Sequence, residues 1–356
     1  MKIASEGSEL MNKQHFQVTE QEWRESSLSE EKLELIQDSF NSIGFAVVFG
    51  LVPASVCKPL VKAFLEDVEL IREKSGLTMH EKHTAEGHLQ LGPRRHAPYV
   101  QKELVANPIL ESVITKLLGP GAWLGFYNGN VNCPNSGYQP LHFDRPYAWT
   151  TEQAAKAAGQ SWPPNTTTVS CSLALSEITD AVGATEIYPG SHRETAVTTW
   201  GKGEQPVHHP EAVEKWSPPA SMTIPAGGVC FRDPRMWHRG VKNSSDTPRP
   251  LVALTYHSAI SKHQRGTLVN LSEEDAGACE LDPSLKKLDS GALGDGRLVF
   301  DADVKSAFDA PNLHGVYRNA RFVDAPLVVN HFLDAHLLGG ARVVEHQPVH
   351  PYPNHD

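Results

Sequence analysis

The chain has 356 residues, of which 40% are apolar and 21% are charged, a composition typical of a folded globular protein. Its formal net charge of −10, without a long Lys/Arg run, argues against binding to a nucleic-acid phosphate backbone. Five widely spaced cysteines without a CxxC pair argue against a disulfide framework or a zinc ribbon, and no stretch resembles a secretory signal or a membrane span. We therefore expect a cytoplasmic protein that binds neither nucleic acid nor membrane.

The first third of the chain is predicted to be mainly helical. Residues 1–26 are polar and lack clear periodicity, so we expect a surface arm. After a cap at Ser27 or Ser29, apolar residues recur in steps of three and four, the pattern of an amphipathic helix. The elements predicted here are a helix from about residue 30 to Ile43, a buried strand over 45–49, a helix beginning at Pro53 and a helix beginning at Pro108.

The segment 74–100 carries several histidines and little periodicity. A surface loop is the simpler interpretation. The alternative is that the stretch from His88 to Tyr99 lines the mouth of an active site, where Arg94 or Arg95 would meet the substrate or a co-substrate.

From Trp123 onward the pattern changes to short strands separated by Pro and Gly turns. Along 168–175, apolar and small polar residues alternate, so one face is suited to a core and the other to a cavity. This indicates a mainly β protein with flanking helices, a double-stranded β-helix (jelly roll, cupin-like) backed by the N-terminal helices. The predicted strands cover 123–127, 168–175, 185–188, 223–231 and 251–256.

The pattern divides the chain into the arm, a catalytic jelly-roll domain over 27–261 and a C-terminal extension over 262–356. The extension is expected to pack on the barrel or to form a subunit contact, as in a homodimer. Two insertions, 145–165 and 195–220, are candidate lids, and the first carries a short helix candidate at 151–158. Tyr147 and Trp149 in the first insertion are candidates for the wall of a substrate pocket, with ordinary packing under a long loop as the alternative.

A candidate metal site organises the middle of the chain. His142 and Asp144 are two residues apart, so on an extended segment both side chains point to the same side. His238, far downstream, is the best candidate for a third ligand. Two histidines and one carboxylate on one face of an octahedron suit Fe(II) and leave positions open for a co-substrate and O₂.

Arg249 follows His238 closely enough to belong to the same site. A guanidinium can hold a carboxylate through two parallel hydrogen bonds. It would therefore suit the far end of a 2-oxo-dicarboxylic acid whose other end is bound to iron.

The segments around these residues resemble the phytanoyl-CoA dioxygenase family of Fe(II)/2-oxoglutarate oxygenases over roughly residues 120–260. The resemblance lies in their order and spacing. The matching segments are Gln139-x-x-His142-x-Asp144, the run from Gly183 to His192, the run from Ala226 to Phe231 that leads into Trp237-His238-Arg239-Gly240, and Asn243 before Arg249.

The resemblance implies Fe(II) as the metal, with 2-oxoglutarate as co-substrate and O₂ as oxidant. It places Thr185 and Gln139 at positions that can bond 2-oxoglutarate, beside Arg249. It also places His192 in a structural turn, not among the ligands. Because related halogenases lack the carboxylate ligand, Asp144 favours hydroxylation-type chemistry over halogenation.

We therefore expect an Fe(II)/2-oxoglutarate-dependent dioxygenase that oxidises a C–H bond of a small organic molecule. A specialised metabolite or amino-acid derivative is the expected substrate class, and hydroxylation, desaturation or cyclisation is the expected outcome. Two alternatives remain at this stage. One is a metal-dependent cupin-like enzyme that does not use 2-oxoglutarate, and the other is a non-catalytic jelly-roll binding protein.

Overall fold

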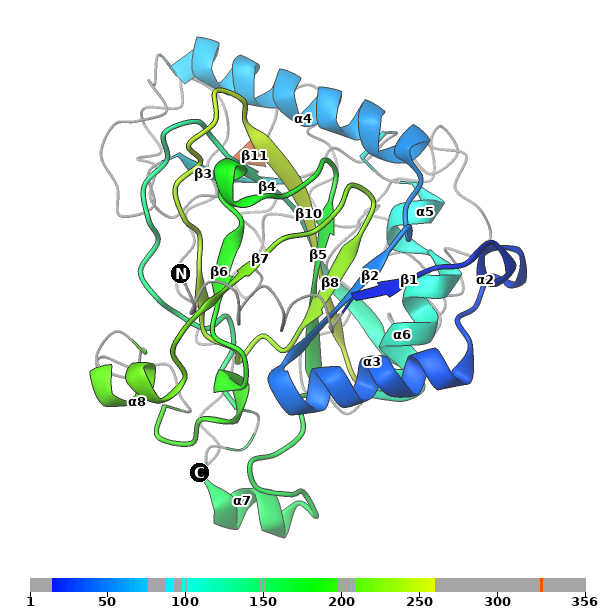
Figure 1. Cartoon of the computed structure of the whole chain (residues 1–356), viewed down its shortest axis with the longest axis vertical. Coiled ribbons are helices and arrows are strands. Elements are labelled where there is room, and N and C mark those ends of the chain that lie inside the picture. Colours follow the sequence, from blue (N-terminus) through cyan, green and yellow to red (C-terminus); the bar gives the residue numbers. More distant parts are fainter. Residues whose placement is uncertain are drawn as a thin grey trace, which may run out of the picture.

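The computed structural model describes residues 15–75, 87–92, 98–99, 101–147, 149, 151–197, 206, 209–259 and 327–328. Two β-sheets form its centre, and helices pack against the larger one (Figure 1). The helices are α2 (Glu20–Glu25), α3 (Glu30–Ile43), α4 (Ala54–Ser75), α5 (Lys102–Val105), α6 (Pro108–Leu118), α7 (Glu152–Ala157), α8 (Pro210–Lys215) and the 3₁₀ turns η1 (Asp180–Val182) and η2 (Ser191–Arg193). The strands are β1 (His15–Gln17), β2 (Phe45–Phe49), β3 (His88–Gly92), β4 (Trp123–Asn132), β5 (Thr168–Ala174), β6 (Thr185–Ile187), β7 (Ala220–Met222), β8 (Val229–Arg232), β9 (His238–Arg239), β10 (Arg249–His257) and β11 (Leu327–Val328).

The large sheet has the strand order β1-β2-β8-β5-β10-β4-β3-β11, and the small sheet has the order β7-β6-β9. All pairings are antiparallel except that of β1 with β2. Strands distant in sequence are therefore neighbours in space, as β8 and β5 are. This is the predicted double-stranded β-helix with helical backing.

The two faces of the large sheet meet different surroundings, because successive side chains of a strand point to opposite sides. On β8, Val229 and Phe231 belong to the large cluster shared with the helices, whereas Cys230 belongs to the cluster shared with the small sheet. The same alternation puts Arg232 on the face of Cys230, toward the small sheet. That face therefore brings polar side chains into the space between the sheets.

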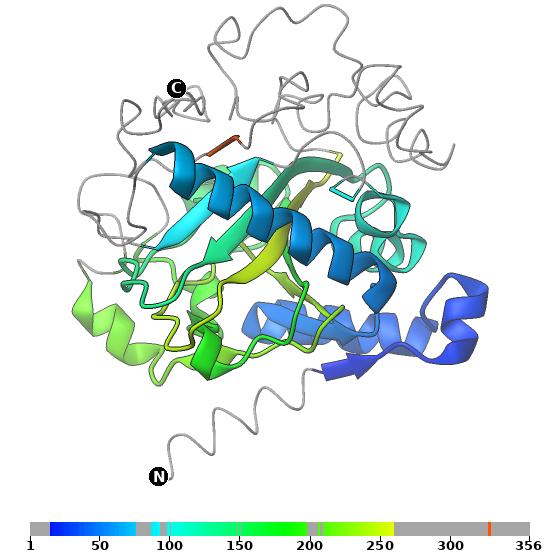
Figure 2. The ribbon, with the colours of Figure 1, turned by 90° about the horizontal axis from the view of Figure 1, so that it is seen from above.

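Helix α3 shows how local sequence sets the backing layer. The Ser29 hydroxyl accepts a hydrogen bond from the Lys32 N–H at 3.3 Å, and Gly44 ends the helix with a φ of +92°. A side chain at Gly44 would be strained at that φ, and its Cβ would lie 2.7 Å from His192 Nδ1. The helix buries Leu33, Ile36 and Phe40 against the sheet. Figure 2 shows α4 crossing the strands of the same sheet.

Several expectations differ from the structure. The polar arm is folded where it is described: β1 pairs with β2, and α2 begins with a capping box between Thr19 and Glu22. The segment 88–92 is not a loop but strand β3, paired with β4. Of the predicted strand 223–231, only the end forms a strand, β8. The residues before it connect β8 to β7 in the other sheet, with a turn at Gly227 and Gly228.

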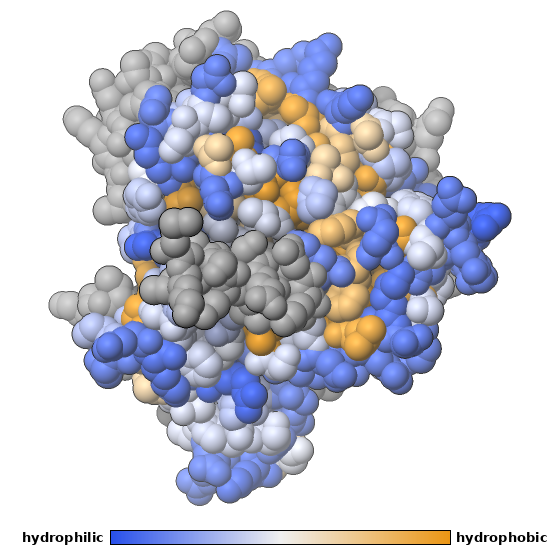
Figure 3. Space-filling model, in the orientation of Figure 1, coloured by the Kyte–Doolittle hydropathy of each residue, from blue (hydrophilic) through white to orange (hydrophobic). Residues whose placement is uncertain are grey.

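The insertions and the extension are described in part. The helix predicted at 151–158 is α7, whose first turn is capped by Thr151, and the second insertion contains α8. Both helices project at the lower side of the molecule in Figure 1, where the surface is mainly hydrophilic (Figure 3). Of the extension 262–356, only Leu327–Val328 is described, as a strand paired with β3; the rest lies outside the described residues.

Among the helices in the described part of the chain, none combines the length and apolar character that a bilayer crossing requires.

Candidate active site

The three predicted metal ligands converge. Candidate ligand atoms of His142, Asp144 and His238 all lie within 4.8 Å of one another. The segments that carry them are joined by a backbone bridge, in which the His142 N–H donates to the His238 carbonyl at 3.0 Å and the His238 N–H donates to the His142 carbonyl at 2.8 Å. Because His238 lies on β9 and His142 on the loop beside it, this bridge holds the two imidazoles 4.4 Å apart, centroid to centroid.

Each imidazole is oriented through its Nδ1. His142 Nδ1 lies 2.8 Å from the Pro140 carbonyl, and His238 Nδ1 lies 3.0 Å from the Met236 carbonyl. When Nδ1 carries the proton and donates it to a carbonyl, Nε2 is left as a free ligand atom. Both Nε2 atoms face Asp144 Oδ1, at 3.8 Å from His142 and 3.3 Å from His238.

The second oxygen of the carboxylate has a different partner. Arg232 Nη2 donates to Asp144 Oδ2 at 2.5 Å, and Arg232 Nη1 lies 3.1 Å from His238 Nδ1. A guanidinium can only donate a hydrogen bond, so its contact requires an unprotonated Nδ1, whereas the contact with the Met236 carbonyl requires a protonated one. The two contacts therefore exclude each other. Once Nε2 binds a metal, the proton must sit on Nδ1, and the contact with Met236 is then the compatible one.

Burial and charge keep His142 and Asp144 in the protonation states that metal binding needs. Burial, followed by the neighbouring His238, lowers the pKa of His142 to about 4, so its ring is neutral near pH 7. Burial would raise the pKa of Asp144, but the charges of His238 and Arg232 outweigh it and hold the pKa well below its usual value. Part of the Asp144 side chain still reaches solvent (37%), so the centre is open on one side.

This donor set fits the metal that the motif implies. Two imidazole nitrogens and one carboxylate oxygen, held together by backbone and side-chain bonds and open on one side, match the facial arrangement used by non-haem Fe(II). His142, Asp144 and His238 are the residues that would hold the ion.

Arg249 provides the second feature of the site. It begins β10, it is 5% exposed, and its Nη2 donates to the Gly183 carbonyl at 2.7 Å. Its Nε is buried without a hydrogen-bond partner, and no carboxylate of the described residues pairs with it. Burial lowers its pKa to about 10, so the group is still cationic at neutral pH. A buried cation with an unused donor is a site for an anion, because leaving it unpaired is costly.

The glycine before β6 makes the contact of Arg249 possible. Gly183 has a φ of +77°, and a Cβ there would lie 2.2 Å from Asn132 Nδ2. The strand that follows runs from this contact to Ile187, which pairs with His238. Thr185 lies between these ends and shares the face of Ile187, which is buried between the sheets.

Gln139 sits beside the second histidine ligand. Its side-chain oxygen accepts a hydrogen bond from the Gly240 N–H at 2.8 Å, and its own N–H donates to the Gly240 carbonyl at 2.9 Å. The side-chain oxygen of Gln139 is thus held by the backbone of the segment that follows His238. Arg239, the other arginine close to His238 in sequence, is ion-paired with Glu186 at 2.8 Å and lies over the Tyr138 ring, so its charge already has a partner.

The predicted pocket residues have different surroundings. Tyr147 is buried, and its hydroxyl donates to the carbonyls of His192 and Glu194 at 2.8 and 3.0 Å, so it serves the packing of the first insertion. Trp149 is half-buried. Arg94 and Arg95 lie outside the described residues.

His192 is buried in η2, and its Nε2 lies 3.2 Å from the Asn41 carbonyl, in agreement with the structural role expected for it.

Two more residues lie near the candidate site. Arg232 was not predicted there, whereas His88 was named in the alternative that the stretch from His88 to Tyr99 lines the mouth of an active site. Arg232 is a charge at the end of a strand that is otherwise apolar, and that contrast was the available signal. His88 shares a register row with Asn132 and Arg249 across β3, β4 and β10. Burial lowers the pKa of His88, and the charge of Arg249 contributes to the lowering. His88 therefore lies near Arg249.

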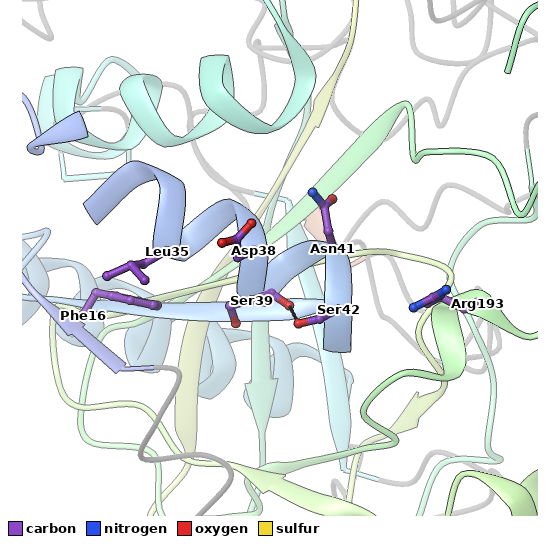
Figure 4. A pocket seen from close by; sticks show the side chains of 7 residues that line it. All are labelled: Phe16, Leu35, Asp38, Ser39, Asn41, Ser42 and Arg193. Atoms are coloured by element: carbon purple, nitrogen blue, oxygen red, sulfur yellow. Dashed lines mark hydrogen bonds between the residues drawn. The ribbon is translucent and has the colours of Figure 1, made fainter. Parts of the chain in front are cut away.

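A hollow elsewhere on the surface has none of this chemistry. It lies along α3, between Phe16 and Arg193, and none of the metal-site residues lines it (Figure 4).

Solved structures with a similar fold include several enzymes. The α-ketoglutarate-dependent epimerase SnoN from nogalamycin biosynthesis has a TM-score of 0.47 and 17% identity, covering 65% of this chain and 82% of SnoN. The carbocyclase SnoK from the same biosynthesis has a TM-score of 0.46 and 18% identity, covering 65% and 85%. EctD from S. alaskensis, solved with 2-oxoglutarate and 5-hydroxyectoine, has a TM-score of 0.45 and 20% identity, covering 65% and 77%. At these values the likeness says nothing about the substrate of this chain.

The family assignment comes from a sequence model. The model of the phytanoyl-CoA dioxygenase (PhyH) family matches residues 40–251, which is more than half of the chain and includes the three ligands and Arg249. This protein therefore belongs to the phytanoyl-CoA dioxygenase family.

Proposed function

We propose that this protein oxidises a C–H bond of a small organic molecule in a reaction that depends on Fe(II), 2-oxoglutarate and O₂. Membership in the PhyH family makes it an oxidoreductase of the Fe(II)/2-oxoglutarate oxygenase class. The observation that carries the site assignment is the buried Arg249, which has a free donor and no carboxylate partner within the described residues, in the same fold as the His142–Asp144–His238 cluster. A dicarboxylic co-substrate would satisfy both features.

Each residue has a distinct role in this proposal. His142, Asp144 and His238 hold Fe(II), and Arg249 binds the distal carboxylate of 2-oxoglutarate. Thr185 and the Gln139 amide are proposed to donate hydrogen bonds to the same molecule. When bound, the iron, 2-oxoglutarate and O₂ together supply the oxidising chemistry, in which 2-oxoglutarate becomes succinate and CO₂.

The ligand set also favours one outcome over another. Asp144 provides a carboxylate where a halogenase would need room for a halide, so hydroxylation, desaturation or cyclisation is proposed. A specialised metabolite or an amino-acid derivative is the proposed substrate class. The first insertion, whose base adjoins Asp144, is a proposed lid that would help to select it.

An anaerobic titration of the Fe(II) protein with 2-oxoglutarate tests the proposal. We expect a weak visible charge-transfer band, which arises when the keto acid chelates iron. Arg249→Ala should weaken 2-oxoglutarate binding by about 10- to 100-fold, since bonds to a charged group contribute roughly 1.5–3 kcal/mol. Arg239→Ala, on the strand beside the site but bound to Glu186, is the matched control and should bind like the wild type.

Other outcomes separate the alternatives. Iron binding without a band would favour a cupin-like enzyme that does not use 2-oxoglutarate. A protein that binds no iron at all would favour a non-catalytic jelly roll.

A further inference from the structure

Arg232 reaches the metal centre from a different layer than the ligands do. His142 and Asp144 lie on a loop, and His238 lies on β9 of the small sheet. Arg232 ends β8 of the large sheet, where it pairs with Phe45 on β2 and Ser170 on β5. Its backbone position is therefore set by pairing within the large sheet, whereas the ligands lie on the small sheet and on a loop.

The contacts of Arg232 are directed at the ligands. Its side chain is only 6% exposed, and its Nη2 donates to Asp144 Oδ2 at 2.5 Å. Its Nη1 faces His238, and its Nε is buried without a partner. Asp144 is the carboxylate that neutralises it among the described residues. A buried guanidinium of this kind is costly to place, so its contact with a ligand calls for a functional reason.

The two oxygens of Asp144 are thereby assigned to different tasks. Oδ2 is occupied by Arg232, while Oδ1 faces the Nε2 atoms of both histidines. One carboxylate oxygen is left for the metal. The guanidinium also places a positive charge beside Asp144, in the centre that the dianion 2-oxoglutarate would approach.

We propose that Arg232 is a positioning residue that restricts Asp144 to one metal-facing oxygen and so preserves the binding of 2-oxoglutarate. This inference rests on the proposed function. Without Arg232, Oδ2 is free to turn toward the metal, and the pocket loses one positive charge. Both changes weaken the binding of 2-oxoglutarate, and neither weakens the binding of the metal ion.

The expected signature is therefore a separation of two affinities. Arg232→Met should bind Mn(II) or Fe(II) within about threefold of the wild type or more tightly, because a nearby cation has been removed. Its affinity for 2-oxoglutarate, read anaerobically from the charge-transfer band, should fall at least about tenfold. Arg232→Lys keeps a point charge near Oδ2 and should recover most of the affinity that Arg232→Met loses.

Arg239→Met is the matched control. Arg239 directly follows a ligand in the sequence and is also ion-paired, but with Glu186. The Arg239→Met substitution should leave the affinity for the metal and the affinity for 2-oxoglutarate unchanged. Melting temperatures in EDTA, measured for every variant, show whether the fold is intact.

Two results would overturn the proposal. One is Arg232→Met binding 2-oxoglutarate like the wild type. The other is a parallel loss of metal and 2-oxoglutarate binding that Arg232→Lys does not recover, which would make Arg232 a purely structural residue. If Arg232→Met does not fold, Arg232→Gln replaces it. The proposal then requires that Arg232→Lys binds 2-oxoglutarate more tightly than Arg232→Gln does, while the two variants bind the metal equally well. Failure of the proposed function is distinct, because the wild type itself would then show no band.

Discussion

His142 links the metal site to the pH dependence of stability. Burial and the neighbouring His238 lower its pKa to about 4 in the folded protein, whereas a histidine in the unfolded chain titrates near its ordinary value of 6.5. Between these two pH values the unfolded chain binds more protons, so stability falls as the pH drops through this range. The free metal site therefore contributes to acid sensitivity.

We predict that the EDTA-treated protein loses stability between pH 7 and pH 5, and that His142→Gln reduces this loss by about 1 kcal/mol. The estimate is half of the roughly 2 kcal/mol that this pKa difference gives between pH 7 and pH 5, because about a third of the side chain (32%) is exposed. Urea unfolding of both proteins at several pH values provides the measurement. Above pH 7.5 the two curves should run parallel, and an equal loss in both proteins at pH 5 would contradict the prediction.

At the scale of elements, the connection between β8 and β9 holds the first insertion in place. The Asp144 and Arg145 N–H groups both donate to the Pro234 carbonyl, at 2.8 and 3.2 Å. Arg235 binds Asp233 through Nε and Nη2, and its Nη1 donates to the Pro164 carbonyl at 2.6 Å, near the far end of the insertion. Both ends of the insertion are thus fixed to the segment that leads into His238.

We predict that Arg235→Met destabilises the protein by about 3–5 kcal/mol, because Asp233 is 1% exposed and would be left as a buried, unpaired charge. The variant should also be cleaved faster by a protease within 145–165. Urea unfolding and limited proteolysis with mass spectrometry measure the two effects. Arg239→Met, which breaks a more exposed ion pair, should cost about 1 kcal/mol or less and leave the cleavage pattern unchanged. Equal costs would refute the argument.

Elements with a strong local signal could be predicted from the sequence. The helix after Ser29 has a cap, an apolar stripe and a terminating glycine, and the structure confirms it as α3. Strand β3 was missed because its pairing with β4 is non-local, and the many histidines around His88 hide any periodicity. Helix α2 did have a signal, the capping box from Thr19 to Glu22, but it is too short to show a periodic stripe.

The site divides in the same way. The spacing of His142 and Asp144 predicts that both side chains lie on one side, His238 was the best candidate downstream, and the matching family segments strengthened the whole set. The contact of Arg232 with Asp144 depends on how β8 lies beneath the loop, which no spacing within the sequence records. For Tyr147 the sequence left two interpretations open, a pocket wall and ordinary packing under a long loop. Its hydroxyl donates to two backbone carbonyls, which supports packing, and the pocket wall stays a prediction.

For the whole molecule, the site is a place where the two sheets meet. The large sheet contributes Arg232 and Arg249, the small sheet contributes His238, and the loop between β4 and β5 contributes His142 and Asp144. Separating the sheets would therefore separate the ligands from one another. Any ion that binds this cluster must stabilise the folded state over the unfolded one, because the unfolded chain does not hold the three ligands together.

We predict that a metal ion at about 100 times its Kd stabilises the protein by about 2.7 kcal/mol and raises its Tm by roughly 4–5 °C. Mn(II) under air and Fe(II) under anaerobic conditions are suitable ions, and 2-oxoglutarate should add a further increase only when the metal is present. Differential scanning fluorimetry with EDTA as the reference measures both steps. His142→Ala should lose the two increases while keeping a cooperative transition, since the variant removes a ligand and leaves the sheets intact. A variant that still gains the full metal increase would show that the ion binds elsewhere, and a 2-oxoglutarate increase without metal would show that Arg249 holds the co-substrate independently of the metal centre.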